Sequence, residues 1–154
     1  MKPYSFQGIS VQVPLREQNL LTLAWFDHFS PRSTVSWFRA DEAIGIFSPG
    51  VDTDGKPSGY PHHLSTAGVA VAGLQLQPGR RLSTEAWTYW IGNVSSTSYS
   101  RMVATVTPHV KIGIEGLYQF RVGNGGNPEP NLAYFPDQRQ WLLGTMLAYE
   151  PDSW

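Results

Sequence analysis

The chain contains no cysteine and few charged residues. The absence of cysteine from its 154 residues excludes disulfide bonds and thiolate metal sites. Charged residues make up 15% of the chain, compared with roughly a quarter of an ordinary domain. The net charge of −1 provides no cationic surface of the kind that holds nucleic acid by counterion release. We therefore expect no nucleic-acid partner.

Long hydrophobic runs are also missing. No apolar stretch approaches the roughly 20 residues that a membrane-spanning helix needs. The first residues, Met1 to Tyr4, do not resemble the apolar start of a signal peptide. From these two absences we expect no insertion into a membrane.

Aromatic and turn-forming residues are plentiful instead. The chain has 6 Trp, 7 Tyr and 7 Phe, together with 15 Gly and 12 Pro. This mixture is typical of many short strands separated by turns. The length is that of one domain, so we expect a single β domain over residues 1–154.

Hydrophobicity alternates with a period of two along most of the chain, which predicts strands with one wet face. The predicted strands are residues 9–13, 20–29, 35–38, 43–47, 69–76, 87–91, 102–106, 110–122 and 141–149. The apolar run 20–29 fits either a strand or a short helix, because its periodicity does not distinguish them. Pro14 is expected to end the first strand. Loops are predicted at 48–63, 92–100 and 123–131, where turn formers cluster. The fold class predicted is all-β: an antiparallel β-sandwich or flattened, jelly-roll-like barrel of about nine strands.

Residues that carry chemistry are sparse. The adjacent His62 and His63 have no metal-ligand spacing, and Asp52 to Gly55 begins like a calcium loop but lacks its later ligands. We find no nucleophile elbow, no phosphate-binding glycine loop and no pair of carboxylates suited to glycosidic hydrolysis. We therefore expect no enzyme, no metal and no cofactor. Asn93 begins a glycosylation sequon, which matters only on a secretory route.

The aromatic residues suggest contact surfaces. Core packing is the expected role of Trp37 and Trp87, whereas Trp90 must face the other way from Trp87 on one strand. An outward Trp or Tyr beside polar loops suits a sugar ring or another subunit. The candidate binding residues are Trp90, Tyr60, Tyr99, Asn124 and Tyr134. The candidate interface residues are Trp87, Tyr89 and Trp154, the last of which we expect to dock on its own domain or a neighbour.

Several motifs follow one another between residues 25 and 91: Trp25-Phe26-Asp27-His28-Phe29, Trp37-Phe38-Arg39, the segment Ala43 to Phe47, Gly68-Val69-Ala70-Val71-Ala72, and Pro78-Gly79 followed by Trp87. Their order resembles that in the protruding domain of calicivirus capsid proteins. The insertion at 48–63 departs from that pattern, and the receptor-contacting subdomain has no counterpart here. The resemblance implies a small β domain excised from a larger coat protein and standing on a virion surface.

The function expected from this resemblance is a capsid spike. It would associate with other copies of itself as a dimer or trimer and attach to a host receptor, with a glycan as one candidate. Two alternatives stay open: a lectin-like carbohydrate-binding β-sandwich, and a phage tail or baseplate β domain.

Overall fold

The computed structural model describes residues 5–16, 18–30, 36–43, 64–135 and 139–150. The strands are β1 (Ser5–Arg16), β2 (Asn19–Ser30), β3 (Phe38–Arg39), β4 (Val69–Gly79), β5 (Leu82–Ile91), β6 (Ser95–Thr107), β7 (Val110–Arg121) and β8 (Gln140–Tyr149). Two short helices accompany them: α1 (Ala40–Ala43) and the 3-10 helix η1 (Pro130–Leu132). Strand residues dominate, so the all-β prediction is confirmed.

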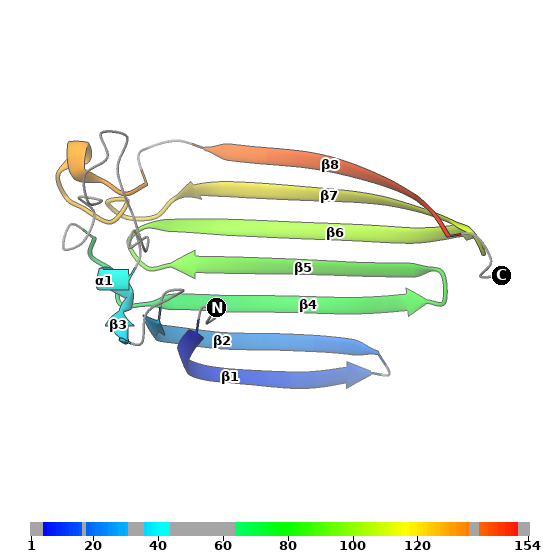
Figure 1. The fold of residues 1–154 in the computed structure, drawn as a ribbon, viewed down its shortest axis with the longest axis horizontal. Coiled ribbons are helices and arrows are strands. Elements are labelled where there is room, and N and C mark those ends of the chain that lie inside the picture. Colours follow the sequence, from blue (N-terminus) through cyan, green and yellow to red (C-terminus); the bar gives the residue numbers. More distant parts are fainter. Residues whose placement is uncertain (1–4, 17, 31–35, 44–63, 136–138, 151–154) are drawn as a thin grey trace.

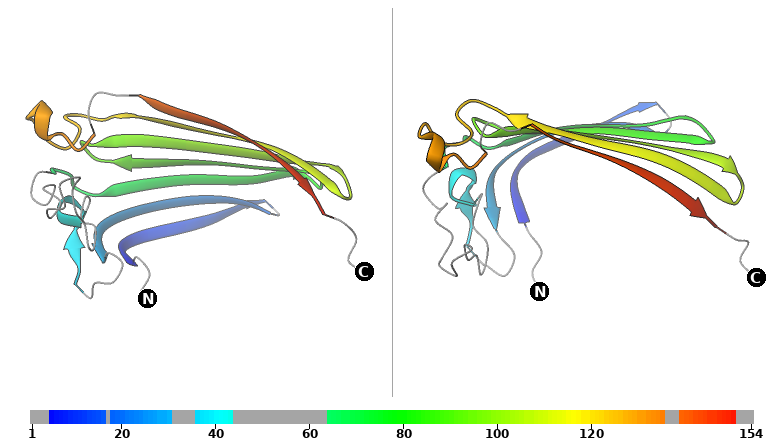
Figure 2. Two further views of the ribbon diagram at one scale, coloured as in Figure 1. Left: turned by 45° about the horizontal axis from the view of Figure 1, so that its top comes forward. Right: turned by 90° about the horizontal axis from the view of Figure 1, so that it is seen from above.

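The strands form one antiparallel meander (Figure 1). The order across the eight-stranded sheet is β1-β2-β4-β5-β6-β7-β8, with the short β3 paired to the end of β2. The sheet is twisted and curved, and β1 and β8 remain separate edges (Figure 2). Within the described ranges no second sheet packs against the first, so the structure shows a single open sheet where the sequence analysis expected a sandwich or flattened barrel.

The two ends of the sheet differ in their connections. Three tight turns join β1 to β2, β4 to β5 and β6 to β7 at one end, and the last two consist of Arg80-Arg81 and Pro108-His109. The two longer connections, from β2 to β4 and from β7 to β8, belong to the opposite end, where their described residues 36–43, 64–68 and 122–135 lie with the short turn 92–94 (Figure 1). We call these the tight-turn end and the long-connection end.

Several strand boundaries differ from the predictions. β1 continues through Pro14 to Arg16, because β1 is an edge strand and a proline there costs no interior hydrogen bond. The predicted loop 92–100 is mostly strand, since β6 begins at Ser95 and pairs with both β5 and β7. Residues 20–29 are strand, not helix.

Two further predictions fail in the segment between β2 and β4. Trp37 is 49% exposed, so the expectation that it packs in a core is wrong. Ala43 ends the helix α1 and does not begin a strand. Residues 44–63, with the predicted loop 48–63, lie outside the described residues.

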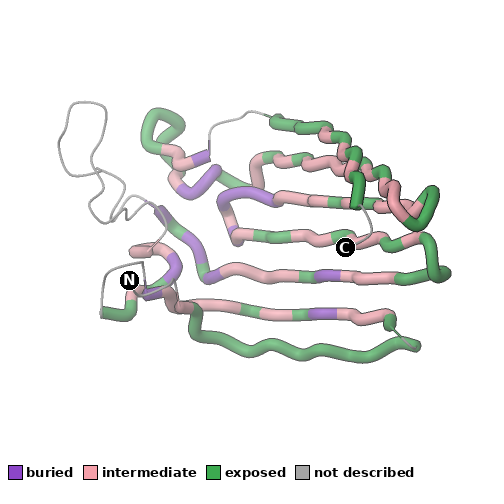
Figure 3. Tube along the Cα trace, turned by 45° about the vertical axis from the view of Figure 1, so that its right-hand side comes forward, coloured by how far each residue is buried: buried purple, intermediate pink, exposed green. Residues whose placement is uncertain are grey.

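The buried core is small and lies at the long-connection end. Leu64, Val94 and Phe135 are buried together, with Ile91 and Tyr134 packed against them. We call this group the end cluster. Burial is concentrated at that end, while most of the sheet is intermediate or exposed (Figure 3). The long strands therefore present two uncovered faces.

Backbone hydrogen bonds tie the end cluster together. Ser65 donates to the Gly126 carbonyl at 2.7 Å, Gly126 donates to the Asn93 carbonyl at 2.6 Å, and Phe135 donates to the Gly125 carbonyl at 3.0 Å. Gly125 has a φ of 67°, and a β-carbon on it would collide with the Phe135 carbonyl. The close approach of these two segments thus requires glycine.

The side chain of Asn93 forms hydrogen bonds to two of the segments in this region, at Ser65 and at Asn124. The φ of Asn93 is 61°, its side-chain amide donates to the Ser65 carbonyl at 3.1 Å, and its Oδ1 accepts from the Asn124 amide at 2.9 Å. We expect Asn93→Ala to lower the free energy of unfolding by about 2 kcal/mol, from two lost hydrogen bonds and a strained backbone. Chemical denaturation measures this change. Asn93→Gly keeps the backbone conformation and should lose less; equal losses would contradict the role given to the left-handed φ.

Candidate functional site

Strand register divides the side chains of the sheet between two faces. Residues directly opposite each other on neighbouring strands point to the same face, and residues alternate along each strand. One complete row across the sheet runs through Ile9, Trp25, Ala70, Trp90, Ser96 and Phe120. This register places each residue of the long strands, between the β-bulges, on one of the two faces.

On β2 and β4 to β8, one face contains no charged residue between the Trp25 row and the tight turns; on β1 the charged Arg16 pairs with Asn19 beside the turn. We call this face the apolar face. It consists of Ile9, Val11, Val13, Leu21, Leu23, Trp25, Ala70, Ala72, Leu74, Leu76, Leu82, Thr84, Ala86, Thr88, Trp90, Ser96, Ser98, Ser100, Met102, Ala104, Val110, Ile112, Ile114, Gly116, Tyr118, Phe120, Trp141, Leu143, Thr145, Leu147 and Tyr149.

Most large side chains of the apolar face are exposed. Leu147 is 78% exposed, Trp141 77% and Ile9 72%. Such a continuous exposed apolar surface is far larger than a soluble monomer usually shows, and it marks contact with another apolar phase or partner.

Aromatic residues gather at one border of the apolar face. Trp25, Trp90 and Phe120 share the row nearest the long-connection end, and Tyr118 and Trp141 pair directly in the next row. We call these five residues the aromatic border. Trp and Tyr have an apolar ring and a polar group, so they favour the boundary between hydrocarbon and water.

The opposite face carries the charges. We call it the polar face. Its charged and amide residues are Gln12, Gln75, Gln77, Glu85, Arg101, Lys111, Glu115, Gln119, Arg121 and Gln140. One row across the strands reads Gln75, Glu85, Arg101, Glu115 and Gly144, so unlike charges sit opposite each other.

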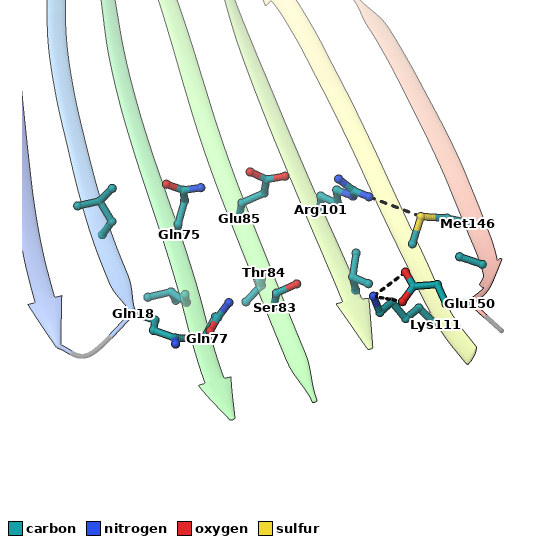
Figure 4. Close-up of a pocket in the computed structure, with 14 residues that line it drawn as sticks. Gln18, Gln75, Gln77, Ser83, Thr84, Glu85, Arg101, Lys111, Met146 and Glu150 are labelled. Carbon is teal, nitrogen blue, oxygen red and sulfur yellow. Dashed lines mark hydrogen bonds and ion pairs between the residues drawn. The ribbon is translucent and has the colours of Figure 1, made fainter. Parts of the chain in front are cut away.

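A hollow of about 570 Å³ lies on the polar face (Figure 4). Its lining extends from Gln18 and Leu20, around the start of β2, to Met146 and Glu150, in β8 and directly after it. Residues near both edges of the sheet can line one hollow only if the sheet curves around it. The polar face is therefore the concave face, and the apolar face is the convex one.

Ion pairs and hydrogen bonds organise the hollow. Lys111 Nζ lies 2.7 Å and 2.8 Å from the two carboxylate oxygens of Glu150 (Figure 4). Arg101 Nη2 points to the Met146 sulfur at 3.5 Å. Beside them, the Tyr99 hydroxyl donates to Glu115 Oε2 at 2.9 Å. The surface combines positive, negative and hydroxyl groups, and no one sign dominates it.

The candidate binding residues from the sequence are not brought together. Trp90 lies on the apolar face and Tyr99 on the polar face, while Asn124 and Tyr134 belong to the long-connection end. Tyr60 lies outside the described residues. Their role in binding stays a prediction.

The candidate interface residues Trp87 and Tyr89 both lie on the polar face, and Trp154 lies outside the described residues. Trp90 does face away from Trp87, as predicted. Sequence reasoning missed the charged row through Glu85, Arg101 and Glu115. The signal was present in the alternate positions of 82–91, 95–107 and 110–121, but it becomes visible only when odd and even positions are considered separately.

Two other features are absent from the part of the chain that the structure describes. Its His, Asp and Glu residues form no group of three or more that could hold a metal ion. None of its helices is long and apolar enough to cross a membrane.

Comparison with known proteins finds similarity in structure only. No family model matches the sequence, and no curated protein matches it. The chain is similar to the outer membrane protein OpdK of Pseudomonas aeruginosa, with a TM-score of 0.65, 15% identity, and coverage of 94% of this chain and 34% of the other.

Two further solved structures show the same likeness. OccK8 (OprE) of Pseudomonas aeruginosa gives a TM-score of 0.61 at 12% identity, covering 85% of this chain and 31% of the other. OccAB2 of Acinetobacter baumannii gives a TM-score of 0.61 at 13% identity, covering 97% and 34%. The likeness is one of fold. The chain spans about a third of the length of the solved structures that it matches.

Proposed function

We propose that this chain forms part of the wall of a transmembrane β-barrel in a bacterial outer membrane. In this proposal the convex apolar face meets lipid and the concave polar face meets an aqueous interior. The observation that carries it is the segregation of charge. Between the aromatic border and the tight turns, the charged residues Glu85, Arg101, Lys111 and Glu115 all lie on the polar face, and the one exception among the described strands is Arg16, the last residue of β1 beside its turn. Alternation of this kind is the signature of membrane β-barrels. The fold likeness to OpdK, an outer membrane protein, supports the same proposal.

The dimensions of the sheet agree with this proposal. Its strands other than β3 are 10 to 13 residues long, and a tilted strand needs about 9–11 residues to cross a bilayer. From Val110 to Phe120 the apolar face extends over ten residue-to-residue steps, about 33 Å at roughly 3.3 Å per step. At a tilt of about 40° this gives an apolar band about 25 Å tall, which is the height of the lipid-facing band of such barrels.

The open edges define what the rest of the wall must supply. Among the described strands, β1 and β8 each have a neighbour on one side only, and unpaired backbone groups are very unfavourable in hydrocarbon. Further strands must therefore pair with both edges to close the barrel. The chain matches about a third of the length of the solved structures, so most of the wall would come from other strands.

The connections suggest an orientation. In outer-membrane barrels the short turns face the periplasm and the longer connections face outward. The tight turns at Arg80-Arg81 and Pro108-His109 would then be periplasmic, and the aromatic border would lie at the outer leaflet. No catalytic reaction is assigned to the chain.

The capsid spike expected from the sequence stays a prediction that no comparison tests. In water, a spike would need to cover the whole apolar face with other protein. Membrane lipid covers the same face without any additional partner, and we therefore favour the membrane proposal.

Cysteine scanning of β8 tests the proposal directly, because the native chain has no cysteine. Single cysteines carrying a nitroxide label would be placed along the strand in the full chain, which is then reconstituted in phospholipid vesicles. The apolar-face positions are Trp141, Leu143, Thr145 and Leu147, and the matched polar-face positions are Leu142, Gly144, Met146 and Ala148.

We expect dissolved oxygen, which concentrates in lipid, to relax the labels on the apolar face. A water-soluble nickel chelate should relax the labels on the polar face. The result is an alternation with a period of two. Labels that all respond to the nickel chelate would show both faces in water and would overturn the proposal.

A further inference from the structure

Two aromatic rings lie next to each other on the polar face of β5. The ring centroids of Trp87 and Tyr89 are 6.4 Å apart, and their planes differ by only 19°. A β-carbon on Gly73, which is directly opposite Trp87 on β4, would collide with the six-membered ring of the indole, so the indole lies over Gly73. Trp87 is half-buried there, and Tyr89 beside it is 42% exposed.

Planar polar groups border these rings. Glu85 follows next on the same face of β5, Gln75 is opposite it on β4, and Arg101 is opposite it on β6. Trp87 Nε1 donates to one carboxylate oxygen of Glu85 at 3.1 Å, which leaves the other oxygen to accept from a ligand. These three polar residues also line the 570 Å³ hollow (Figure 4).

Arg101 keeps much of its hydrogen-bonding capacity. Its guanidinium contacts the Met146 sulfur at 3.5 Å, and a thioether is a weak acceptor. In the part of the chain that the structure describes, no carboxylate oxygen lies within 4.0 Å of it. With five N–H donors, the guanidinium has several available for a ligand.

We propose that Trp87 and Tyr89 form a stacking surface for a neutral sugar ring, whose hydroxyls bind to Gln75, Glu85 and Arg101. The C–H groups on one side of a pyranose carry a slight positive charge and pack against the negative face of an aromatic ring. Vicinal hydroxyls need donors and acceptors side by side, and an amide, a carboxylate and a guanidinium in one row supply both. The alternating charges of that row give no net attraction for an ion, which favours a neutral solute.

This inference rests on the proposed function for the route by which a solute reaches the polar face, and it adds a class of solute. Binding itself needs no bilayer, so the two are tested separately. The full chain in detergent micelles would be titrated with maltohexaose and with cellohexaose, and binding would be followed by tryptophan fluorescence and calorimetry. We expect saturable binding of at least one of the two oligosaccharides.

Tyrosines on the two faces of the sheet provide the matched variants. Tyr89→Ala removes a ring from the stacking surface and should weaken binding about tenfold. Tyr118→Ala removes an equally exposed tyrosine ring from the apolar face and should leave binding unchanged. Trp87→Phe retains a ring over Gly73 and should bind between the native chain and Tyr89→Ala, so the test does not depend on whether Trp87→Ala folds.

The outcomes separate the two proposals. A chain that shows the lipid alternation of β8 but binds neither oligosaccharide would retain the membrane proposal and overturn the sugar site. Equal weakening by Tyr89→Ala and Tyr118→Ala would also overturn it. Sugar binding with the expected variant pattern, in a chain whose β8 labels all meet water, would support the site and reject the membrane wall.

Discussion

Met102→Arg is expected to destabilise the membrane-inserted chain by about 2–4 kcal/mol, the cost of a cationic side chain near the middle of a lipid-facing barrel surface. Met102 is 47% exposed on the apolar face and pairs directly with Thr84 and Ile114. None of these neighbours offers a counter-ion. Denaturant unfolding of the chain in phospholipid vesicles, followed by tryptophan fluorescence, measures the change.

Val103→Arg is the matched control for this substitution. Val103 is the next residue of β6 and lies on the polar face, where it lines the hollow with Arg101 and Lys111. An arginine there keeps access to water, so we expect a much smaller loss. If Val103→Arg cost as much as Met102→Arg, the assignment of lipid and water to the two faces would be wrong.

Phe135→Ala is expected to cost about 3–5 kcal/mol in local stability, because it removes the largest fully packed side chain among the buried residues Leu64, Val94 and Phe135. Phe135 is 8% exposed and packs with Leu64 and Val94, although these residues are far apart in the sequence. The loss should release the segments around Ser65 and Gly126, whose backbone hydrogen bond depends on this packing. Hydrogen exchange resolved by residue measures it.

The expected pattern is local. Amides of the end cluster should exchange faster in Phe135→Ala, while amides in the middle of β6 and β7 keep their protection, since their ladder does not depend on Phe135. Leu132→Ala is the control, because Leu132 is 38% exposed on the neighbouring 3-10 helix. Uniform loss of protection over the sheet would show that the end cluster nucleates the whole fold.

The sequence predicted the presence of the strands better than the residues at which they begin and end. Segments such as 9–13 and 110–114 alternate so regularly that local pattern alone indicates β structure. Residues 95–100 have the composition of a loop, and only pairing with β5 and β7 makes them strand. One such pair is Thr88 with Ser98, whose hydroxyl oxygens are 3.3 Å apart. Cross-strand partners decide such segments, and local propensity does not reveal them.

The expectation of no membrane insertion shows the limit of a search for apolar runs. Such a search detects helices, in which all side chains facing lipid occur in one continuous stretch. In a strand only every second residue faces the lipid, so Ile112 and Ile114 are separated by a residue of the other face. The proposed function thus departs from that expectation because the apolar surface is assembled across strands.

By itself the sequence determined that this chain is all-β, free of disulfides, and built from alternating strands, because period-two hydrophobicity and turn residues act over a few neighbouring positions. Only the tertiary structure decided that Trp25, Trp90 and Phe120 share one row and that Gln75, Glu85 and Arg101 share another. Register is a relation between segments distant in sequence, and a shift of one residue would exchange the two faces. The segregation of charge on which the proposed function rests is therefore a property of the paired sheet.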